Sequence, residues 1–120
     1  LLDMATLNAI NDKMYKALAQ LGGRIDARVY CPHPAEANCD CRKPRPGMFE
    51  DIARRFSASL AGVPSVGDSL RDMQASAAVG CQPMLVLTGK GQKTLAAGGL
   101  PEKTAVFEDL AEAVRKIIAA

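Results

Sequence analysis

Five segments of the chain place apolar residues three or four positions apart, which is the spacing of one face of an α-helix. The first segment has Asp3 or Thr6 as a candidate N-cap, and two glycines follow its last apolar residue. The third has Ser69 near its start and Gly80 at its end. The pattern therefore predicts helices over residues 4–21, 47–57, 69–80, 91–99 and 109–120.

Short apolar runs between these segments are typical of buried strands. They predict strands over residues 24–31, 63–67, 83–89 and 105–109. Strands that alternate with helices through short connections form a parallel sheet covered by helices on both faces. The fold class predicted for residues 1–120 is α/β, and a chain of 120 residues has room for one domain.

Two predictions concern burial. The last helix carries four apolar residues at helical spacing, and we expect it to bury all of them: Leu110, Val114, Ile117 and Ile118. Cys81 stands apart from the other cysteines at the start of a predicted strand, and we interpret it as a small buried hydrophobic residue.

Composition narrows the class of protein. The formal net charge is +2 and 48% of the residues are hydrophobic, which is typical of an ordinary soluble domain. No apolar run approaches the roughly 20 residues of a membrane span, and no signal peptide is visible, so we expect a cytoplasmic protein without membrane contact. The chain begins at Leu1 without an initiator methionine and enters a helical pattern at once, which indicates the latter part of a longer protein.

Residues 31–41 contain three of the four cysteines and the single histidine. Cys31 and His33 are two positions apart, and so are Cys39 and Cys41, so each pair can present two ligands on one side of an extended backbone. Four such ligands suit a tetrahedral zinc ion and leave no open position, which indicates a structural metal. The alternative is an ordinary thiol pair with a surface histidine. A disulfide between Cys39 and Cys41 would be strained.

A pair of carboxylates follows the second predicted strand. Asp68 comes directly after it, and Asp72 lies one helical turn later. Ligands of α/β sheets bind outside the carboxyl ends of the strands, and carboxylates there can hold Mg²⁺. Alternatively, Asp68 is a helix N-cap and Asp72 a first-turn acid favoured by the helix dipole. The spacing alone does not decide between the two.

Basic residues follow the cysteine-rich segment directly. Arg42, Lys43 and Arg45 could grip a phosphate or form a solvated basic turn. The segment TGKGQKT, residues 88–94, is not a Walker loop, because Gln92 stands where that motif needs glycine. It is a glycine-rich turn that could offer backbone N–H groups near the same rim.

Taken together, CPHPAEANCDCRKPRPGM, VGDSLRD and VLTGKGQKTL resemble phosphatases of the haloacid-dehalogenase (HAD) superfamily, above all the branch that acts on phosphorylated heptose. The resemblance implies a three-layer Rossmann-like fold with a parallel sheet of order 3-2-1-4-5. It also implies structural zinc at residues 31–41, with the ligands Cys31, His33, Cys39 and Cys41.

The resemblance assigns roles to four further residues. Lys43 would contact the phosphate, and Arg42 would contact the substrate, a phosphorylated sugar. Asp68 would bind a catalytic Mg²⁺, with Asp72 as its supporting acid. In such enzymes an aspartate attacks the phosphoryl group, and water hydrolyses the resulting aspartyl-phosphate. Magnesium and the lysine neutralise charge on the transferred group.

The nucleophile of the superfamily lies in an Asp-x-Asp motif after the first strand, and this chain has no such motif at a strand end. We therefore expect the first two strands and the nucleophile to precede Leu1. Residues 1–120 would be the C-terminal part of a single domain, inactive alone and a monomer when complete. The missing strands would lie between strands 24–31 and 63–67.

Other functions stay open at this point. Histidinol-phosphate phosphatases of the same superfamily carry a similar zinc segment, but LTGKG followed by KTL resembles the heptose branch more closely. The chain could instead be a non-catalytic, zinc-stiffened module that contacts nucleic acid through Arg42, Lys43 and Arg45. An aromatic content of 4% argues against it, because few rings are available for base stacking. A remnant that binds phosphorylated sugar without hydrolysing it is the third possibility.

Overall fold

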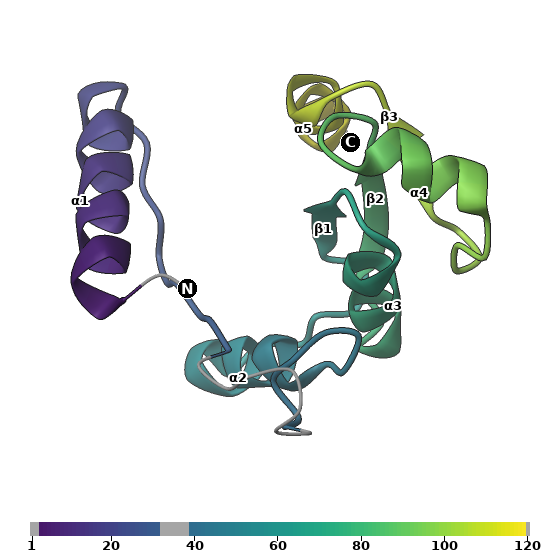
Figure 1. Ribbon diagram of the computed structural model, residues 1–120, viewed down its shortest axis with the longest axis horizontal. Coiled ribbons are helices and arrows are strands. Elements are labelled where there is room, and N and C mark those ends of the chain that lie inside the picture. Colours follow the sequence, from purple (N-terminus) through teal and green to yellow (C-terminus); the bar gives the residue numbers. More distant parts are fainter. Residues whose placement is uncertain (1–2, 32–38, 120) are drawn as a thin grey trace.

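A computed structural model of the protein describes residues 3–31 and 39–119. Helices and strands alternate along most of this part of the chain (Figure 1). All five predicted helices and three of the four predicted strands are confirmed. The elements are α1 (Met4–Gln20), α2 (Gly47–Phe56), β1 (Pro64–Gly67), α3 (Leu70–Ala78), β2 (Gln82–Val86), α4 (Gly91–Ala97), β3 (Ala105–Phe107) and α5 (Leu110–Ala119).

The three strands form one parallel sheet in the order β1-β2-β3, which confirms the α/β class. In the register of the sheet, Val66 lies opposite Met84, and Val86 lies opposite Phe107. Helix α3 connects β1 to β2, and α4 connects β2 to β3. Because all three strands run the same way, the turns that follow β1 and β2 meet at one edge of the sheet.

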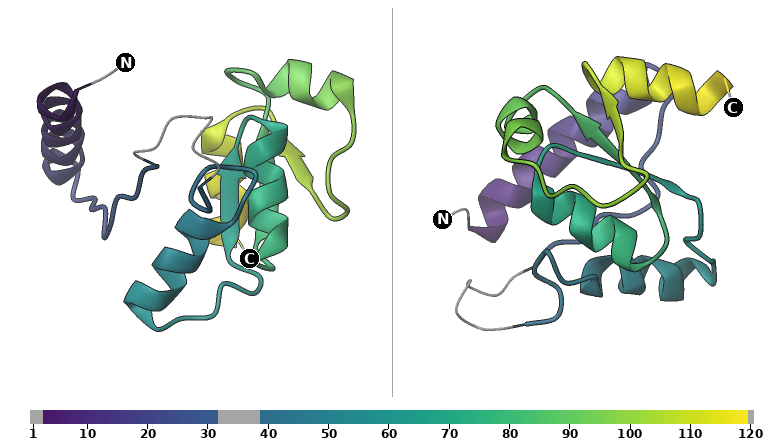
Figure 2. Two further views of the ribbon diagram at one scale, coloured as in Figure 1. Left: turned by 60° about the horizontal axis from the view of Figure 1, so that its bottom comes forward. Right: turned by 90° about the vertical axis from the view of Figure 1, so that its right-hand side faces the viewer.

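The core lies on both faces of β2. Met84 and Val86 cluster with Ala113 of α5, so these two side chains face that helix. Neighbouring side chains of a strand point to opposite faces, so fully buried Leu85 faces α3, where Met73 is also fully buried. Figure 2 shows α3 and α5 on opposite sides of the sheet. Helices therefore cover the sheet from both sides, as the element pattern predicts.

The prediction for the last helix is wrong for three of its four residues. Leu110 is 56% exposed and Ile118 is 77% exposed, and Val114 is exposed as well. Ala113 is buried instead, and Ile117 packs beside it against the core. The reason is the rotation of α5. The row that contains Ala113 and Ile117 faces the sheet, and no part of the described chain covers the neighbouring apolar row. The prediction for Cys81 is confirmed, because it is buried, and burial raises the pKa of its thiol.

Residues 24–31 form no strand, which corrects the fourth strand prediction. A strand needs a neighbour for its backbone groups, and none of the described strands pairs with this segment. It runs beside α1 instead (Figure 1). Arg28 Nε donates to the Tyr15 hydroxyl at 3.0 Å, and its guanidinium lies 5.4 Å from that ring's centroid. Side chains therefore hold this segment.

Helix α1 stands apart from the sheet (Figure 1). It has no extensive contact with any other described helix or strand, and its large apolar residues Met4, Ile10 and Met14 are exposed. Segment 24–31 does not pair with β1. The expected sheet order, with further strands between them, stays a prediction. No helix in the described part of the chain is long and apolar enough to cross a membrane.

Leu85→Ala tests the core. Leu85 is fully buried on the α3 face of the sheet, so we expect the substitution to lower the free energy of unfolding by about 2–5 kcal/mol. Leu95→Ala on α4 is the matched control, because that leucine is exposed and its removal leaves no cavity. Urea unfolding followed by circular dichroism measures both. Equal losses in the two variants would contradict this account of the core.

Candidate functional site

The site lies at the edge of the sheet where β1 and β2 end. Asp68 and Ser69 follow β1 directly, and the turn from residue 87 to 90 follows β2. A third segment, residues 41–46, reaches the same edge from the cysteine-rich part of the chain, because Lys43 contacts α3 there. The structure therefore brings Lys43 to the two aspartates, from which it is at least 25 positions away in sequence. Asp68 follows β1, and Asp72 lies in α3.

The Asp72 carboxylate is held at the start of α3 by a capping box. Its Oδ2 accepts hydrogen bonds from the backbone N–H groups of Asp68 and Ser69, both at 3.2 Å, and the Ser69 hydroxyl accepts one from Asp72 N. Ser69 is thus the N-cap, and the alternative of Asp68 as N-cap is wrong. Gly67 permits this close packing, because a Cβ there would lie 2.6 Å from Asp72 Oδ2.

The other oxygen of Asp72 forms an ion pair with Lys43. Lys43 Nζ lies 2.5 Å from Asp72 Oδ1, and the two side chains are 38% and 18% exposed. Burial alone would raise the pKa of Asp72, but hydrogen bonds from Lys43 and Ser69 outweigh burial, and the pKa lies below its ordinary value. Lys43 is therefore not part of a solvated basic turn. It is a paired cation at the edge of the sheet.

Asp68 is held by the turn after β2. Its Oδ2 accepts a hydrogen bond from the backbone N–H of Lys90 at 2.8 Å, and its main-chain carbonyl accepts one from the Thr94 hydroxyl at 2.8 Å. Sequence reasoning placed residues 88–94 near this rim but missed their contacts with Asp68. The only signal was the glycine-rich turn itself, because a main-chain donor leaves no mark in the sequence.

The three described cysteines of the cysteine-rich segment converge. The Sγ of Cys31 lies 3.2 Å from that of Cys39 and 2.8 Å from that of Cys41, and the third sulfur pair is 3.5 Å apart. None of the three forms a disulfide, so the disulfide alternative is not what the structure shows. The fourth predicted ligand, His33, lies outside the described residues.

The cluster is suited to a metal cation. A hydrogen bond with Cys31, burial, and then the contact with Cys39 raise the pKa of Cys41 to about 12, because a thiolate there would lie beside two further sulfurs. A cation at the centre reverses that balance and favours thiolates. The described cysteines can therefore hold a metal ion, since one ligand atom of each lies within 4.8 Å of the others.

Hydrogen bonds tie the cysteine cluster to the turn that carries Lys43. Gly47 N donates to the Asp40 carbonyl at 2.9 Å, and Arg45 Nη1 donates to the Cys39 carbonyl at 3.2 Å. The Arg42 carbonyl accepts from Arg45 N at 3.0 Å, and the Arg42 side chain is half-buried on the same turn. Residues 39–47 thus form one compact unit that presents Lys43 to Asp72.

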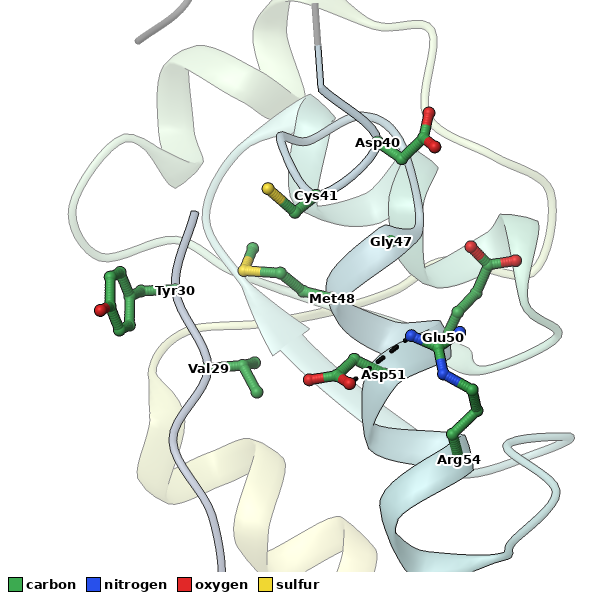
Figure 3. A pocket seen from close by; sticks show the side chains of 9 residues that line it. All are labelled: Val29, Tyr30, Asp40, Cys41, Gly47, Met48, Glu50, Asp51 and Arg54. Carbon is green, nitrogen blue, oxygen red and sulfur yellow. Dashed lines mark ion pairs between the residues drawn. The ribbon is translucent and has the colours of Figure 1, made fainter. Parts of the chain in front are cut away.

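A shallow pocket of about 320 Å³ lies beside Cys41, between residues 29–30 and the start of α2 (Figure 3). Cys41 and Met48 line it together with Asp51 and Arg54. Asp51 is already paired with Arg54 at 3.5 Å and with Arg55 at 3.1 Å. Neither Lys43 nor Asp72 lines this pocket, so it is separate from the site at the sheet edge.

Lys43→Gln tests the ion pair. The pKa of Asp72 is lowered from 3.8, so the pair stabilises the fold above that pH, and this contribution is lost as the pH falls through the lowered value. We expect the variant to be less stable than the parent at about pH 7, with a difference that shrinks towards about pH 3. Urea unfolding at both pH values measures this. Lys13→Gln, on the exposed surface of α1, should match the parent. A difference that does not change with pH would contradict the role of Asp72.

Comparisons with known proteins identify relatives of the family that the sequence motifs resemble. A sequence model described as HAD-hydrolase-like matches residues 40–113. The D-glycero-beta-D-manno-heptose-1,7-bisphosphate 7-phosphatase of Bordetella bronchiseptica is 62% identical over 98% of this chain and 66% of its own length. The enzyme of that name from Pseudomonas putida is 48% identical over 96% of this chain and 65% of its own length. The chain thus spans about two thirds of the length of these relatives.

Solved structures give the same picture. The fold matches the crystal structure of the D,D-heptose 1,7-bisphosphate phosphatase from B. bronchiseptica complexed with magnesium and phosphate, with a TM-score of 0.95 and 62% identity over 98% of this chain and 65% of that one. It matches the phosphatase of that description from Burkholderia thailandensis with a TM-score of 0.80 and 50% identity, over 100% of this chain and 67% of that one. The chain therefore belongs to the HAD-hydrolase-like family, as its motifs predict.

Proposed function

We propose that this chain carries part of the active site of a magnesium-dependent phosphatase that removes the 7-phosphate of D-glycero-D-manno-heptose 1,7-bisphosphate. The observation that carries the proposal is the convergence of Lys43, Asp68 and Asp72 at the carboxyl edge of a parallel sheet. The names of the relatives supply the substrate, and magnesium and phosphate are bound in the B. bronchiseptica structure.

The residues at this edge suit a phosphate and a hard cation. Asp68 has a carboxylate oxygen that Lys90 does not engage, and carboxylate oxygens are the ligands that Mg²⁺ prefers. The Lys43 ammonium has three N–H donors, one of which Asp72 takes, so two are left for phosphate oxygens. Magnesium held at Asp68 would neutralise charge on the phosphate. Arg42, on the same turn as Lys43, is proposed to contact the sugar phosphate.

The proposed reaction requires a nucleophile that these residues do not supply. Lys43 and Asp72 are paired with each other, and the 120 residues contain no Asp-x-Asp pair. An aspartate from a segment outside them would attack phosphorus and displace the sugar oxygen, and water would then release inorganic phosphate from the acyl-phosphate. Lys43 holds a positive charge beside the phosphoryl oxygens throughout. We propose that the complete enzyme is a monomer and acts in the cytoplasm.

The activity test uses a fusion in which the Asp-x-Asp segment of a family phosphatase precedes this chain. We expect magnesium-dependent phosphate release from heptose 1,7-bisphosphate, faster than from histidinol phosphate. Asp68→Asn should lower kcat/KM on the order of 100-fold, because an electrostatic partner of the reacting group is lost. Asp26→Asn, an exposed carboxylate outside the site, is the matched control.

Two outcomes would sink the heptose proposal. Faster release from histidinol phosphate would assign the chain to the other branch of the superfamily. Salt-sensitive binding of single-stranded nucleic acid without any hydrolysis would favour the binding module.

We also propose structural zinc at Cys31, Cys39 and Cys41, with His33 as the fourth ligand. The convergence of the three described sulfurs supports it, because thiolates and imidazole suit this ion. Tetrahedral zinc with Zn–S bonds of about 2.3 Å would hold the sulfurs about 3.7 Å apart. The separations of 2.8–3.5 Å are shorter, so binding of the ion would spread the three sulfurs slightly. The metal would brace residues 39–47, and with them Lys43.

Cys39→Ser tests the zinc site. We expect about one zinc per chain in the parent, measured by atomic emission, and less metal and a lower melting temperature in the variant. Cys81→Ser is the matched control, because Cys81 is buried under α3 and is not part of the cluster, so it should keep its zinc. Unchanged thermal stability after complete chelation of the parent would show that the ion is not structural.

A further inference from the structure

We propose that Gly89, the backbone N–H of Lys90 and the hydroxyl of Thr94 position the Asp68 carboxylate for a divalent cation. This inference rests on the proposed function, in which Asp68 holds magnesium. Thr94 is thus a positioning residue. It acts through Asp68 and touches neither the cation nor the substrate.

The first observation is the hydrogen bond to the carboxylate itself. Lys90 N donates to Asp68 Oδ2 at 2.8 Å, which is within the usual range for an amide bonded to a carboxylate. This bond fixes which oxygen faces α4. The other oxygen of the carboxylate is left for a cation.

The second observation is the hydroxyl of Thr94, one turn into α4. Its Oγ1 lies 2.8 Å from the main-chain carbonyl of Asp68 and 3.1 Å from that of Lys90. The hydroxyl has one proton to donate, and the shorter contact is the one to Asp68. Thr94 therefore fastens the backbone at Asp68 to α4, and the Lys90 amide fastens the side chain.

The third observation is the absence of a side chain at Gly89. A Cβ at this position would lie 2.3 Å from Asp68 Oδ2, closer than any real contact. The backbone here also has φ +57°, a left-handed conformation that favours glycine. Gly89 is thus the residue that lets the turn after β2 approach the carboxylate closely enough for the Lys90 amide to bind it.

The topology of the sheet explains why these groups meet. β1 and β2 are neighbours, with Gly67 opposite Leu85, so the turns that follow them lie side by side. The Asp68 carboxylate is consequently held from one side by the turn after β2, while its own amide is held by Asp72. Loss of either support would let the carboxylate rotate, and partners of this kind affect metal affinity 10–100-fold as a rule.

The experiment measures Mn²⁺ binding to the fusion protein described above, by electron paramagnetic resonance of the free ion. Mn²⁺ is an oxygen-seeking probe for a magnesium site. We expect Thr94→Val to weaken binding about tenfold, and Thr94→Ser, which keeps the hydroxyl, to restore it. Thr104→Val is the matched control, because its hydroxyl also donates to a main-chain carbonyl, that of Pro101, away from the site. It should bind Mn²⁺ like the parent.

Gly89→Ala is a second, independent variant. We expect it to weaken Mn²⁺ binding more than Thr94→Val does, because the added methyl group displaces the carboxylate. Gly99→Ala is its control, since Gly99 has φ +80° but a Cβ there would meet nothing within 4 Å. The backbone strain is thus shared by both variants, and only Gly89→Ala also crowds Asp68.

The outcomes separate this inference from the function on which it rests. If the parent binds Mn²⁺, Asp68→Asn does not, and Thr94→Val binds like the parent, the positioning role is overturned and the proposed function stands. If Asp68→Asn binds as tightly as the parent, or the parent does not bind, the role of Asp68 fails and this inference fails with it. If Thr94→Ser does not restore binding, the effect of Thr94→Val is steric, and the hydroxyl has no positioning role.

Discussion

The Asp72 carboxylate is the junction on which the site depends. One of its oxygens binds the Lys43 ammonium, and the other accepts two backbone N–H groups at the start of α3. A half-buried carboxylate would favour its neutral form without these partners, and the pKa of Asp72 is lowered only because they outweigh burial. The end of β1, the start of α3 and the turn that carries Lys43 are thus joined by one charged group.

The two ends of this junction are built differently. The capping box is local, since Ser69 and Asp72 are three residues apart and their side chains need only each other's backbone N–H groups at the helix start. The bond to Lys43 spans 29 positions and requires the folded arrangement of residues 39–47. That segment has no helix or strand before Gly47 and is held by main-chain hydrogen bonds and the converging cysteines. The position of Lys43 therefore depends on the cluster, even though the cluster lies outside the site.

Local patterns predicted most of the fold because helices α1 to α5 and strands β1 to β3 are marked by apolar spacing and by Gly and Ser at their ends. The failures are all non-local. Residues 24–31 have a strand-like sequence, but a strand exists only where another strand accepts its hydrogen bonds. In α5 the apolar stripe was visible, but the sequence could not show that Ala113 and not Leu110 faces the sheet.

The same distinction applies to the site. Lys43, Asp68 and Asp72 could be selected from motifs, yet spacing could not separate a cap from a ligand. The structure excludes Asp68 as the cap, because Ser69 caps α3 and Asp68 is held by the turn after β2. Its role as a metal ligand is a proposal. That turn was recognised only as glycine-rich. The group in this turn that donates to Asp68 is a backbone amide 22 positions away in sequence. Almost any residue at position 90 has such an amide, so the side chain at that position does not reveal the hydrogen bond. Only Gly89, which lets the turn approach the carboxylate, indicates it.

The pairing of Lys43 with Asp72 also fixes the position of the ammonium that the proposed function assigns to phosphate binding. An unpaired ammonium that is 38% exposed would tend to turn towards water, and its long side chain would sample many rotamers. Asp72 holds the Lys43 ammonium in one place by accepting a hydrogen bond from one of its three N–H groups. Under the proposed function, a phosphate could bind the two N–H donors that Asp72 leaves, so Asp72 need not be displaced. The ion pair is therefore a form of preorganisation, because the cost of ordering Lys43 is met in folding and not in binding.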